Sequence, residues 1–236
     1  MRAEEENRMR MYIIRHGETE WNAEGRLQGQ TDISLNENGV RLARITGQAL
    51  RDVNFDLIIT SPLKRARQTA ELVTEGRQIP ILEDARISEI SFGSWEGLGS
   101  RKHNFQIPSE HFQDFYEDPF RFQNAVDGES VADLCVRARS FFQGLLGSRR
   151  YQDKTILIAS HGCACRAILN NVYEDKENFW HGKVPPNCAV SIVDVTDGKA
   201  VLTASDQIYY DPAECVDFRT GKLAGADALQ PAHLVI

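Results

Sequence analysis

Two short apolar runs in this 236-residue sequence end in the dipeptide His-Gly, and a histidine at such a junction could do chemistry. The first run, residues 11–14, leads into Arg15 and His16, and the second, residues 154–159, leads through a serine into His161. A histidine can act as a nucleophile or as an acid and base near neutral pH. The neighbouring arginine presents a planar fork of donors that suits phosphate oxygens. One such junction arises easily by chance, so its repetition marks both histidines as candidate site residues.

A third candidate, Arg65, follows the apolar run 55–60 and a Ser-Pro dipeptide at 61–62. Serine favours the N-cap of a helix and proline favours its first turn, so a helix is expected to begin at this dipeptide. An anion at that helix N-terminus would meet free backbone amides. We therefore expect Arg65 to contact a ligand, while Lys64 and Arg67 form a solvated basic face.

Two carboxylates, Glu89 and Glu96, are candidate acids in the loop that follows the edge-type strand 79–82. Taken alone, each is more often an exposed loop side chain than a catalytic acid. A cysteine pair at 163 and 165 is close to His161, but its spacing and the absence of a second ligand cluster do not fit a metal site. We expect these two cysteines to pack the start of a helix.

The elements that position these residues alternate between strand and helix. This alternation favours an α/β fold, a three-layer α/β/α sandwich with a mostly parallel sheet and an antiparallel edge strand. Ligands bind at the carboxyl ends of parallel strands, so Arg15, His16, Arg65 and His161 should converge in one cleft. The expected helices cover residues 36–51, 61–73, 130–149 and 163–172, and a hairpin over 188–204 is expected at the sheet edge.

The region between residues 99 and 128 is rich in phenylalanine and is broken by Asp118-Pro119. A long irregular insertion of this kind is often a functional lid, although it could also be a surface subdomain that buries its own aromatic rings. We predict one α/β domain over residues 11–210 that contains this lid. A disordered N-terminal extension, residues 1–10, precedes the domain, and a C-terminal tail, residues 211–236, follows it.

Composition narrows the function further. The net charge of −7 argues against a nucleic-acid surface, and no apolar run is long enough to span a membrane. Five cysteines, an odd number, suit reduced thiols in the cytoplasm better than a disulfide framework.

Four motifs together resemble the histidine phosphatase superfamily, and more closely its phosphoglycerate-mutase-like branch. They occur in the family's order over about residues 11–205, outside the insertion and the tail. In this sequence they read Arg15-His16-Gly17-Glu18-Thr19, Ser61-Pro62-Leu63-x-Arg65-Ala66, Glu89 followed by Gly93-x-Trp95-Glu96-Gly97, and Ser160-His161-Gly162.

The resemblance implies a phosphomonoesterase that acts on a phosphorylated small molecule through a phosphohistidine. His16 would be the nucleophile and Glu89 the proton donor, while Arg15, Arg65 and His161 would hold the phosphate. Asn22, Gln28 and Gly29 match positions that line the family's phosphate or substrate pocket. No cofactor and no metal are implied, because two arginines and a second histidine supply positive charge. The sequence indicates neither the substrate nor the oligomeric state.

The main alternative is a 2,3-bisphosphoglycerate-dependent phosphoglycerate mutase. In mutases of this branch a basic residue typically follows the acid, whereas here Ile90 follows Glu89 and cannot bind a carboxylate. Arg101 and Lys102 keep this alternative open, because either could replace the missing cation. A non-catalytic phospho-ligand-binding module is a further alternative, which would predict the loss of His16, Glu89 or His161.

Overall fold

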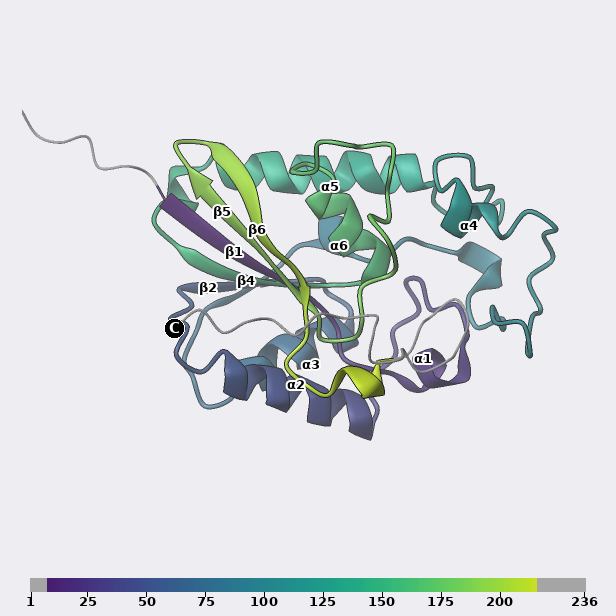
Figure 1. The fold of residues 1–236 in the computed structure, drawn as a ribbon, viewed down its shortest axis with the longest axis horizontal. Coiled ribbons are helices and arrows are strands. Elements are labelled where there is room, and N and C mark those ends of the chain that lie inside the picture. The colour runs from purple at the N-terminus through teal and green to yellow at the C-terminus, as the bar shows by residue number, and fades with distance from the viewer. Residues whose placement is uncertain (1–7, 216–236) are drawn as a thin grey trace, which may run out of the picture.

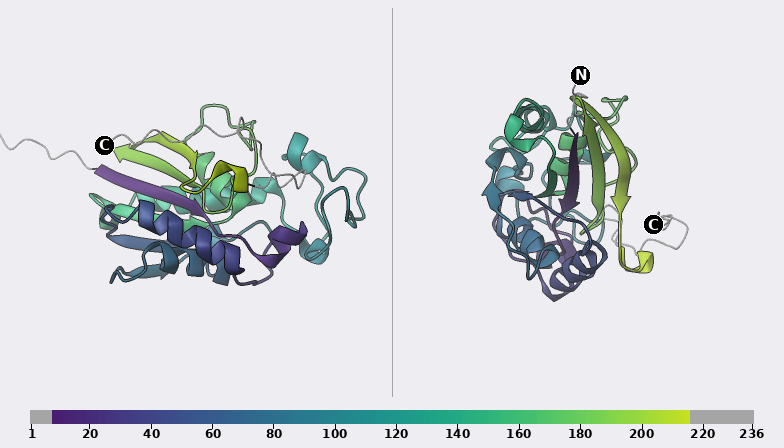
Figure 2. Two further views of the ribbon diagram at one scale, coloured as in Figure 1. Left: turned by 60° about the horizontal axis from the view of Figure 1, so that its bottom comes forward. Right: turned by 90° about the vertical axis from the view of Figure 1, so that its left-hand side faces the viewer.

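A six-stranded sheet forms the centre of the computed structural model, which describes residues 8–215 (Figure 1). Its spatial order is β3-β2-β4-β1-β5-β6. The first four strands in this order are parallel, β5 is antiparallel to β1, and β6 pairs with β5 at the outer edge (Figure 2). The strands are β1 (Arg8–Arg15), β2 (Leu57–Thr60), β3 (Ile81–Glu83), β4 (Thr155–Ser160), β5 (Val190–Thr196) and β6 (Lys199–Gln207). The predicted mostly parallel sheet with its edge hairpin is confirmed.

Side chains alternate across β1, and each set enters a different hydrophobic core. Met11 and Ile13 belong to the core under α5 (Val131–Leu146) and α6 (Gly162–Leu169). Tyr12 and Ile14 belong to the core over α2 (Glu37–Ala49) and α3 (Lys64–Val73). Figure 1 shows these two helix pairs on opposite sides of the sheet. A sheet with both faces covered reads as a continuous apolar run, which explains the apolar strands of the sequence. The three-layer prediction is therefore confirmed.

Two of the longer helices begin at a side-chain cap that the sequence contains. Asn36 accepts a hydrogen bond from the Gly39 N–H at the start of α2, and Ser130 accepts one from the Asp133 N–H at the start of α5. The helices are α1 (Glu20–Glu24), α2 (Glu37–Ala49), α3 (Lys64–Val73), α4 (Asp114–Glu117), α5 (Val131–Leu146) and α6 (Gly162–Leu169). Short 3-10 turns cover Ala85–Ile87, Gly93–Trp95, Arg149–Tyr151 and Pro212–Glu214. Within residues 8–215, none of these helices is long and apolar enough to cross a membrane.

The predicted N-terminal boundary was wrong for residues 8–10, because β1 begins at Arg8. Met9 is buried opposite Val195 of β5, and the Arg10 guanidinium forms an ion pair with Asp194 at 2.5 Å. Pairing with β5 thus extends the strand beyond its apolar residues. The rest of the predicted extension, residues 1–7, lies outside the described residues.

The predicted tail also begins too early. The turn Pro212–Glu214 is ordered against the domain, because Glu214 pairs with Arg41 of α2 and Cys215 is buried beside Tyr210. The remaining tail, residues 216–236, lies outside the described part of the chain.

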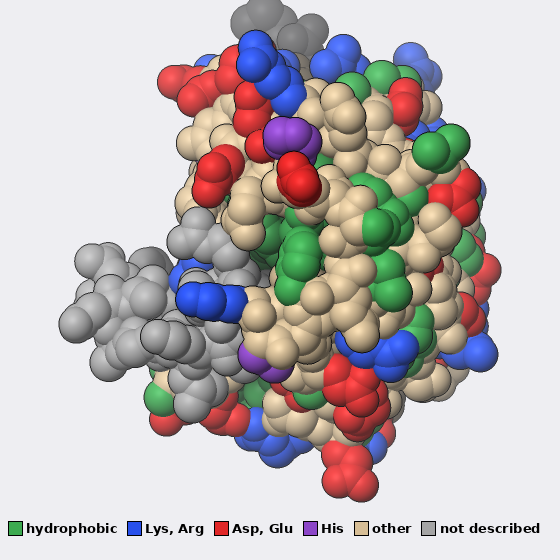
Figure 3. All heavy atoms as spheres, turned by 90° about the vertical axis from the view of Figure 1, so that its right-hand side faces the viewer, with side chains coloured by type: hydrophobic (Ala, Val, Ile, Leu, Met, Phe, Trp, Pro, Cys, Tyr) green, Lys and Arg blue, Asp and Glu red, His purple; other side chains and the backbone are tan. Residues whose placement is uncertain are grey.

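The insertion between 99 and 128 contains one short helix, α4, and packs its aromatic rings together. Phe112, Phe115 and Phe122 are buried with ring centroids 5.1–5.9 Å apart. Phe120 and Val126 remain exposed. Figure 3 shows apolar side chains in the middle of the face that lies on the right of Figure 1. The insertion therefore buries most of its own rings, as the surface-subdomain alternative expected. Four of its residues, Ser100, Arg101, Phe115 and Tyr116, also line the candidate site described below.

Candidate active site

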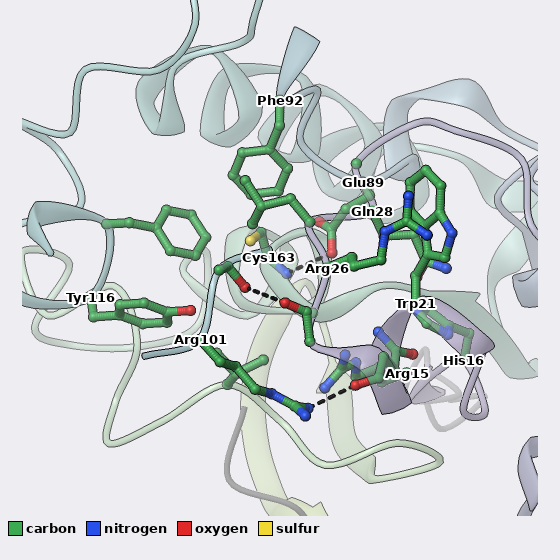
Figure 4. A pocket seen from close by; sticks show the side chains of 18 of the residues that line it. Arg15, His16, Trp21, Arg26, Gln28, Glu89, Phe92, Arg101, Tyr116 and Cys163 are labelled. Atoms are coloured by element: carbon green, nitrogen blue, oxygen red, sulfur yellow. Dashed lines mark hydrogen bonds between the residues drawn. The ribbon is translucent and has the colours of Figure 1, made fainter. Parts of the chain in front are cut away.

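A cavity opens at the carboxyl ends of the central strands and brings most of the predicted site residues together (Figure 4). His16 and Arg15 come from the end of β1, Arg65 from α3, and Glu89 from the loop after β3. The predicted residues that line the cavity are Arg15, His16, Asn22, Gln28, Gly29, Arg65 and Glu89. His161 does not line it, but its ring lies behind that of His16 with 5.2 Å between the centroids.

The His16 ring is fixed by a bond to its own loop. Nδ1 lies 2.6 Å from the Gly17 carbonyl oxygen, and because a carbonyl can only accept, Nδ1 carries the proton. Nε2 is therefore the nitrogen with the free lone pair. The ring is buried, and burial together with the positive charges of Arg65 and Arg15 lowers the pKa of His16 well below 6.5. The ring is thus held neutral, as a nitrogen nucleophile must be.

Two buried arginines lie beside this ring. Arg65 donates to the Gly29 carbonyl at 2.6 Å and to the Thr31 carbonyl at 2.9 Å, while its Nε has no hydrogen-bond partner among the described residues. Arg15 donates to the Pro185 carbonyl. Burial lowers the pKa of Arg65 to about 10, so the guanidinium is still charged at neutral pH. Two cations in a water-poor cavity attract an anion strongly.

The His161 ring contacts Ser61, which the sequence had predicted to cap a helix. Its Nε2 lies 2.8 Å from Ser61 Oγ, and its Nδ1 has no hydrogen-bond partner within residues 8–215. The prediction that a helix begins at Ser61 was wrong. Helix α3 begins at Lys64 without a side-chain cap, and Ser61 instead accepts from the Leu63 N–H at 3.3 Å. The serine is thereby turned toward the histidine. Burial and the charge of Arg65 lower the pKa of His161 well below 6.5.

The Glu89 carboxylate contacts the amino end of α6, the helix that begins directly after His161. Its carboxylate accepts hydrogen bonds from the backbone N–H groups of Cys163 at 3.2 Å, Ala164 at 3.1 Å and Ile90 at 3.0 Å. A helix N-terminus stabilises a carboxylate because its amides have no partner inside the helix. The sequence separates Glu89 from α6 by five elements, and this contact brings the acid to the cavity that contains His16.

The loop after β1 forms another wall, and a second carboxylate holds it. Glu96 accepts from the Gln30 N–H at 2.9 Å, from the Thr31 N–H at 2.7 Å and from the Phe92 N–H at 3.1 Å. The loop passes so close that a Cβ on Gly29, where φ is +52°, would lie 2.0 Å from Glu96 Oε1. Glu96 does not line the cavity, so of the two candidate acids only Glu89 can reach a ligand there.

Asn22 and Gln28 are oriented by neighbours that the sequence analysis did not single out. Asn22 Oδ1 accepts from the Asn187 side chain at 3.3 Å, which leaves the amide nitrogen of Asn22 for a ligand. Gln28 donates to Thr19 Oγ1 at 2.7 Å. Asn187 and Ser61 were missed as site residues. The Ser-Pro dipeptide signalled Ser61 only as a helix cap, and Asn187 lies in a loop with no motif.

The outer part of the cavity is lined by aromatic rings and two further arginines. Figure 4 shows Tyr116 and Phe92 on one side and Trp21 with Arg26 on the other. Arg101 is also buried at this level. The insertion thus contributes Phe115, Tyr116 and Arg101 to the lining.

The charges of Lys64 and Arg67 face away from the cavity. Both are exposed and pair with carboxylates, Lys64 with Asp32 and Arg67 with Glu71 and Glu83. Cys163 and Cys165 are buried in α6, as predicted. Within residues 8–215 no group of histidine, cysteine and carboxylate side chains could hold a metal ion.

Comparison with known proteins is consistent with this geometry. A relative from Arabidopsis thaliana, named "Probable 2-carboxy-D-arabinitol-1-phosphatase", is 35% identical over 191 residues, which cover 80% of this chain and 38% of that protein. The chain therefore spans well under half the length of this relative. A relative from Erwinia tasmaniensis, named "Probable phosphoglycerate mutase GpmB", is 30% identical over 205 residues, covering 84% of this chain and 93% of that protein.

Among solved structures, the alpha-ribazole phosphatase from Shigella flexneri matches with a TM-score of 0.73 and 29% identity, covering 84% of this chain and 96% of that one. The sequence pattern of the histidine phosphatase superfamily (branch 1) matches residues 11–207. This match covers the sheet except for the first three residues of β1, and it covers every predicted site residue, so the resemblance seen in the sequence is confirmed. The chain belongs to the histidine phosphatase superfamily, branch 1.

Proposed function

We propose that this protein hydrolyses a phosphorylated small molecule through a phosphohistidine on His16. The observation that carries this proposal is the bond from His16 Nδ1 to the Gly17 carbonyl, which leaves Nε2 as a neutral nucleophile beside two arginines. Nε2 attacks phosphorus, the bond from phosphorus to the ester oxygen breaks, and Glu89 gives its proton to that oxygen. Water then attacks the phosphohistidine, Glu89 takes a proton from it, and the P–N bond breaks to release phosphate.

Positive and proton-donating groups would hold the transferred phosphoryl group. Arg15 and Arg65 are charged and line the cavity, and the amide of Asn22 adds a donor. His161 would donate through Nδ1. In this proposal Ser61 Oγ, which accepts from the Leu63 N–H, donates its own hydrogen to His161 Nε2, and the ring proton is then on Nδ1. Fixed charge of this kind stabilises the oxygens on which negative charge collects in the transition state.

Rapid quenching tests the intermediate. With a substrate labelled at phosphorus, the label should reach His16 before free phosphate appears, and the adduct should be acid-labile and alkali-stable. The same reaction should survive chelation by EDTA, because Arg15, Arg65 and His161 supply the charge that a metal would otherwise bring. A label on a serine, or activity that EDTA abolishes and one divalent ion restores, would contradict the proposal.

The mutase alternative is supported by the name of one relative but less by the cavity of this chain. Ile90, which occupies the place of the expected basic residue, is fully buried and cannot face a substrate carboxylate. Arg101 does line the cavity, yet its guanidinium donates to the carbonyls of Asn22 at 2.7 Å and Ala23 at 2.9 Å. We therefore propose net hydrolysis, with at most trace isomerisation of 3-phosphoglycerate.

A direct assay separates the two reactions. The protein is incubated with 3-phosphoglycerate and catalytic 2,3-bisphosphoglycerate, and 2-phosphoglycerate formed is compared with phosphate released. Phosphate release should exceed isomerisation. Isomerisation that outruns release, at rates above those for other phosphomonoesters, would reverse the assignment and point to Arg101 as the carboxylate partner. Binding without turnover of any ester would favour a non-catalytic module.

We further propose that the protein acts in the cytoplasm without a nucleic-acid or membrane partner. All five cysteines are free thiols, four of them buried, which suits a reducing compartment.

Burial also raises the pKa of the Cys163 thiol, which lines the cavity, so this thiol is no competitor of His16 as a nucleophile.

A further inference from the structure

We infer that the cavity selects phosphomonoesters whose alcohol part carries an uncharged aromatic ring. This inference rests on the proposed function, because it concerns the part of the ester that leaves as an alcohol. The phosphate end of the cavity is polar and cationic. The outer end, where the alcohol part would lie, is built from aromatic rings.

One wall of this outer end is a preformed stack of rings. Phe115 packs edge-to-face against Phe92 at 5.4 Å, Tyr116 at 5.0 Å and Trp180 at 5.3 Å between ring centroids. The Trp180 indole N–H donates to the Phe115 carbonyl at 2.8 Å, which satisfies its polar group. Three of these rings are buried and Tyr116 is half-buried. These rings are therefore already ordered before a ligand binds, which lowers the entropy cost of binding.

The opposite wall is the indole of Trp21, and its position is also fixed. The Arg26 guanidinium carbon lies 4.4 Å from the Trp21 ring centroid. Arg26 itself donates to the Gly97 carbonyl at 2.6 Å and to Glu24 at 3.1 Å. The guanidinium thus braces the indole from one side and is neutralised by a carboxylate (Figure 4). Between this indole and Tyr116, the cavity offers ring faces and edges to a ligand.

The arginines at this level are committed to protein acceptors, which decides against a charged alcohol part. The Arg101 guanidinium binds the carbonyls of Asn22 and Ala23, and Arg26 binds Gly97 and Glu24. A substrate carboxylate would compete with these carbonyl and carboxylate acceptors for the guanidinium donors. An aromatic ring does not compete for these donors and gains from the ring contacts.

Three esters of primary alcohols test this inference, because their reacting ends are alike: 2-phenylethyl phosphate, ethyl phosphate and O-phosphoserine. The value of kcat/KM reports the steps up to phosphohistidine formation, and hydrolysis of the phosphohistidine is common to all three. We expect kcat/KM for the phenylethyl ester to exceed that of the ethyl ester by at least about tenfold, the gain expected from burying one ring. O-phosphoserine should be the poorest of the three.

Variants on the two walls locate the effect. Tyr116→Ala and Trp21→Leu should each lower the ratio of kcat/KM for the phenylethyl ester to that for ethyl phosphate by about five- to tenfold. Because ethyl phosphate is turned over at the same site, it also reports whether each variant is folded. Phe120→Ala is the matched control, since Phe120 is an exposed ring of the same insertion that does not line the cavity.

Each outcome has a distinct meaning. Equal efficiency on all three esters, preference for O-phosphoserine, or variants that lower all three values alike would overturn the ring selectivity and leave the phosphatase intact. If none of the esters is hydrolysed and no label reaches His16, the proposed function itself fails. A phenylethyl preference that disappears in Tyr116→Ala but persists in Phe120→Ala is the result expected.

Discussion

His16 and His161 follow neighbouring parallel strands at matching positions, yet their ring nitrogens have different hydrogen-bond partners. The two strands pair with Arg15 opposite Ser160, so each histidine follows the last paired residue of its strand. His16 Nδ1 donates a hydrogen bond to the Gly17 carbonyl, and Nε2 has a free lone pair. His161 contacts Ser61 through Nε2 and keeps Nδ1. The same dipeptide thus leaves Nε2 free on one ring and Nδ1 free on the other.

The difference comes from the segment that succeeds each strand. After β1 the chain enters an open loop, whose carbonyl at Gly17 can reach the ring. After β4 the chain enters α6 at once, with His161 as its N-cap, so no local carbonyl is offered to the ring. The partner of His161 must then come from elsewhere, here from Ser61 after β2. The hydrogen-bond partner of each ring therefore decides which nitrogen is left free: Gly17, inside the motif, for His16, and Ser61, after another strand, for His161.

The largest expected loss of activity distinguishes His16 from His161. We expect His16→Ala to lower kcat by at least about 10⁴-fold, because the group that forms the covalent intermediate is gone. His161→Ala should lower kcat by roughly 10²–10³-fold, the effect of losing one donor to the transition state. Steady-state kinetics combined with rapid quenching distinguishes them, since only the His161 variant should still carry labelled phosphate. His103→Ala, a change at an exposed histidine, is the control. A phosphoenzyme in His16→Ala would exchange the two roles.

Arg65 should affect both rings alike. Its charge contributes to the low pKa of His16 and also of His161, and its guanidinium is fixed by Gly29 and Thr31. We expect Arg65→Ala to lower kcat/KM by about 10²-fold and Arg65→Lys to recover little, because an ammonium cannot reproduce the fork. Arg67→Ala, on the exposed side of α3, is the matched control. Full recovery in Arg65→Lys would show that charge alone is needed.

A change at Ser61 should lower activity less, and it should act through His161 alone. We expect Ser61→Ala to lower kcat/KM by about three- to tenfold, because His161 Nε2 loses the hydrogen bond that fixes its tautomer. Ser61→Thr keeps the hydroxyl and should recover most of the activity. Nitrogen NMR of the labelled imidazoles reads the tautomer directly, and the His16 signals should not change. A shift of the proton on His16 instead would mean that the two rings are coupled.

The smallest effect concerns stability against pH. The ordinary pKa of histidine is 6.5, and burial lowers the pKa of both rings well below it in the folded protein. Below pH 6.5 the unfolded chain therefore binds protons that the folded chain does not. The free energy of unfolding should fall with decreasing pH in this range, by at most about 1.4 kcal/mol per pH unit for each ring, and these rings should contribute no slope above it.

Urea unfolding from about pH 7.5 down to about pH 5 measures this slope, without phosphate in the buffer. His16→Asn and His161→Asn should each flatten it, and neither should change it near pH 7.5. An unchanged slope in both variants would mean that other groups, such as surface carboxylates, govern acid unfolding.

The sequence predicted those parts of the molecule that depend on local patterns. Apolar runs predicted the strands that form the two cores, and Asn36 and Ser130 predicted helix starts because a cap acts within three residues. The helix start at Ser61 was predicted wrongly, because its hydroxyl serves a residue 100 positions away. The contact of Glu89 with α6 and the role of Asn187 were likewise not predictable. Both depend on tertiary approach, which no local pattern records.

The place of β1 in the sheet has a consequence for synthesis on the ribosome. β1 is an interior strand, and both of its neighbours, β4 and β5, come from the second half of the chain. His161 follows His16 by 145 residues, an interval that takes roughly 7–30 s to translate at ordinary rates of elongation. During that interval the strand that leads into His16 emerges with both edges open, and Met11 and Ile13 have no core to enter. Until β4 is synthesised, an open apolar strand of this kind is a site for aggregation, and it lies directly before His16.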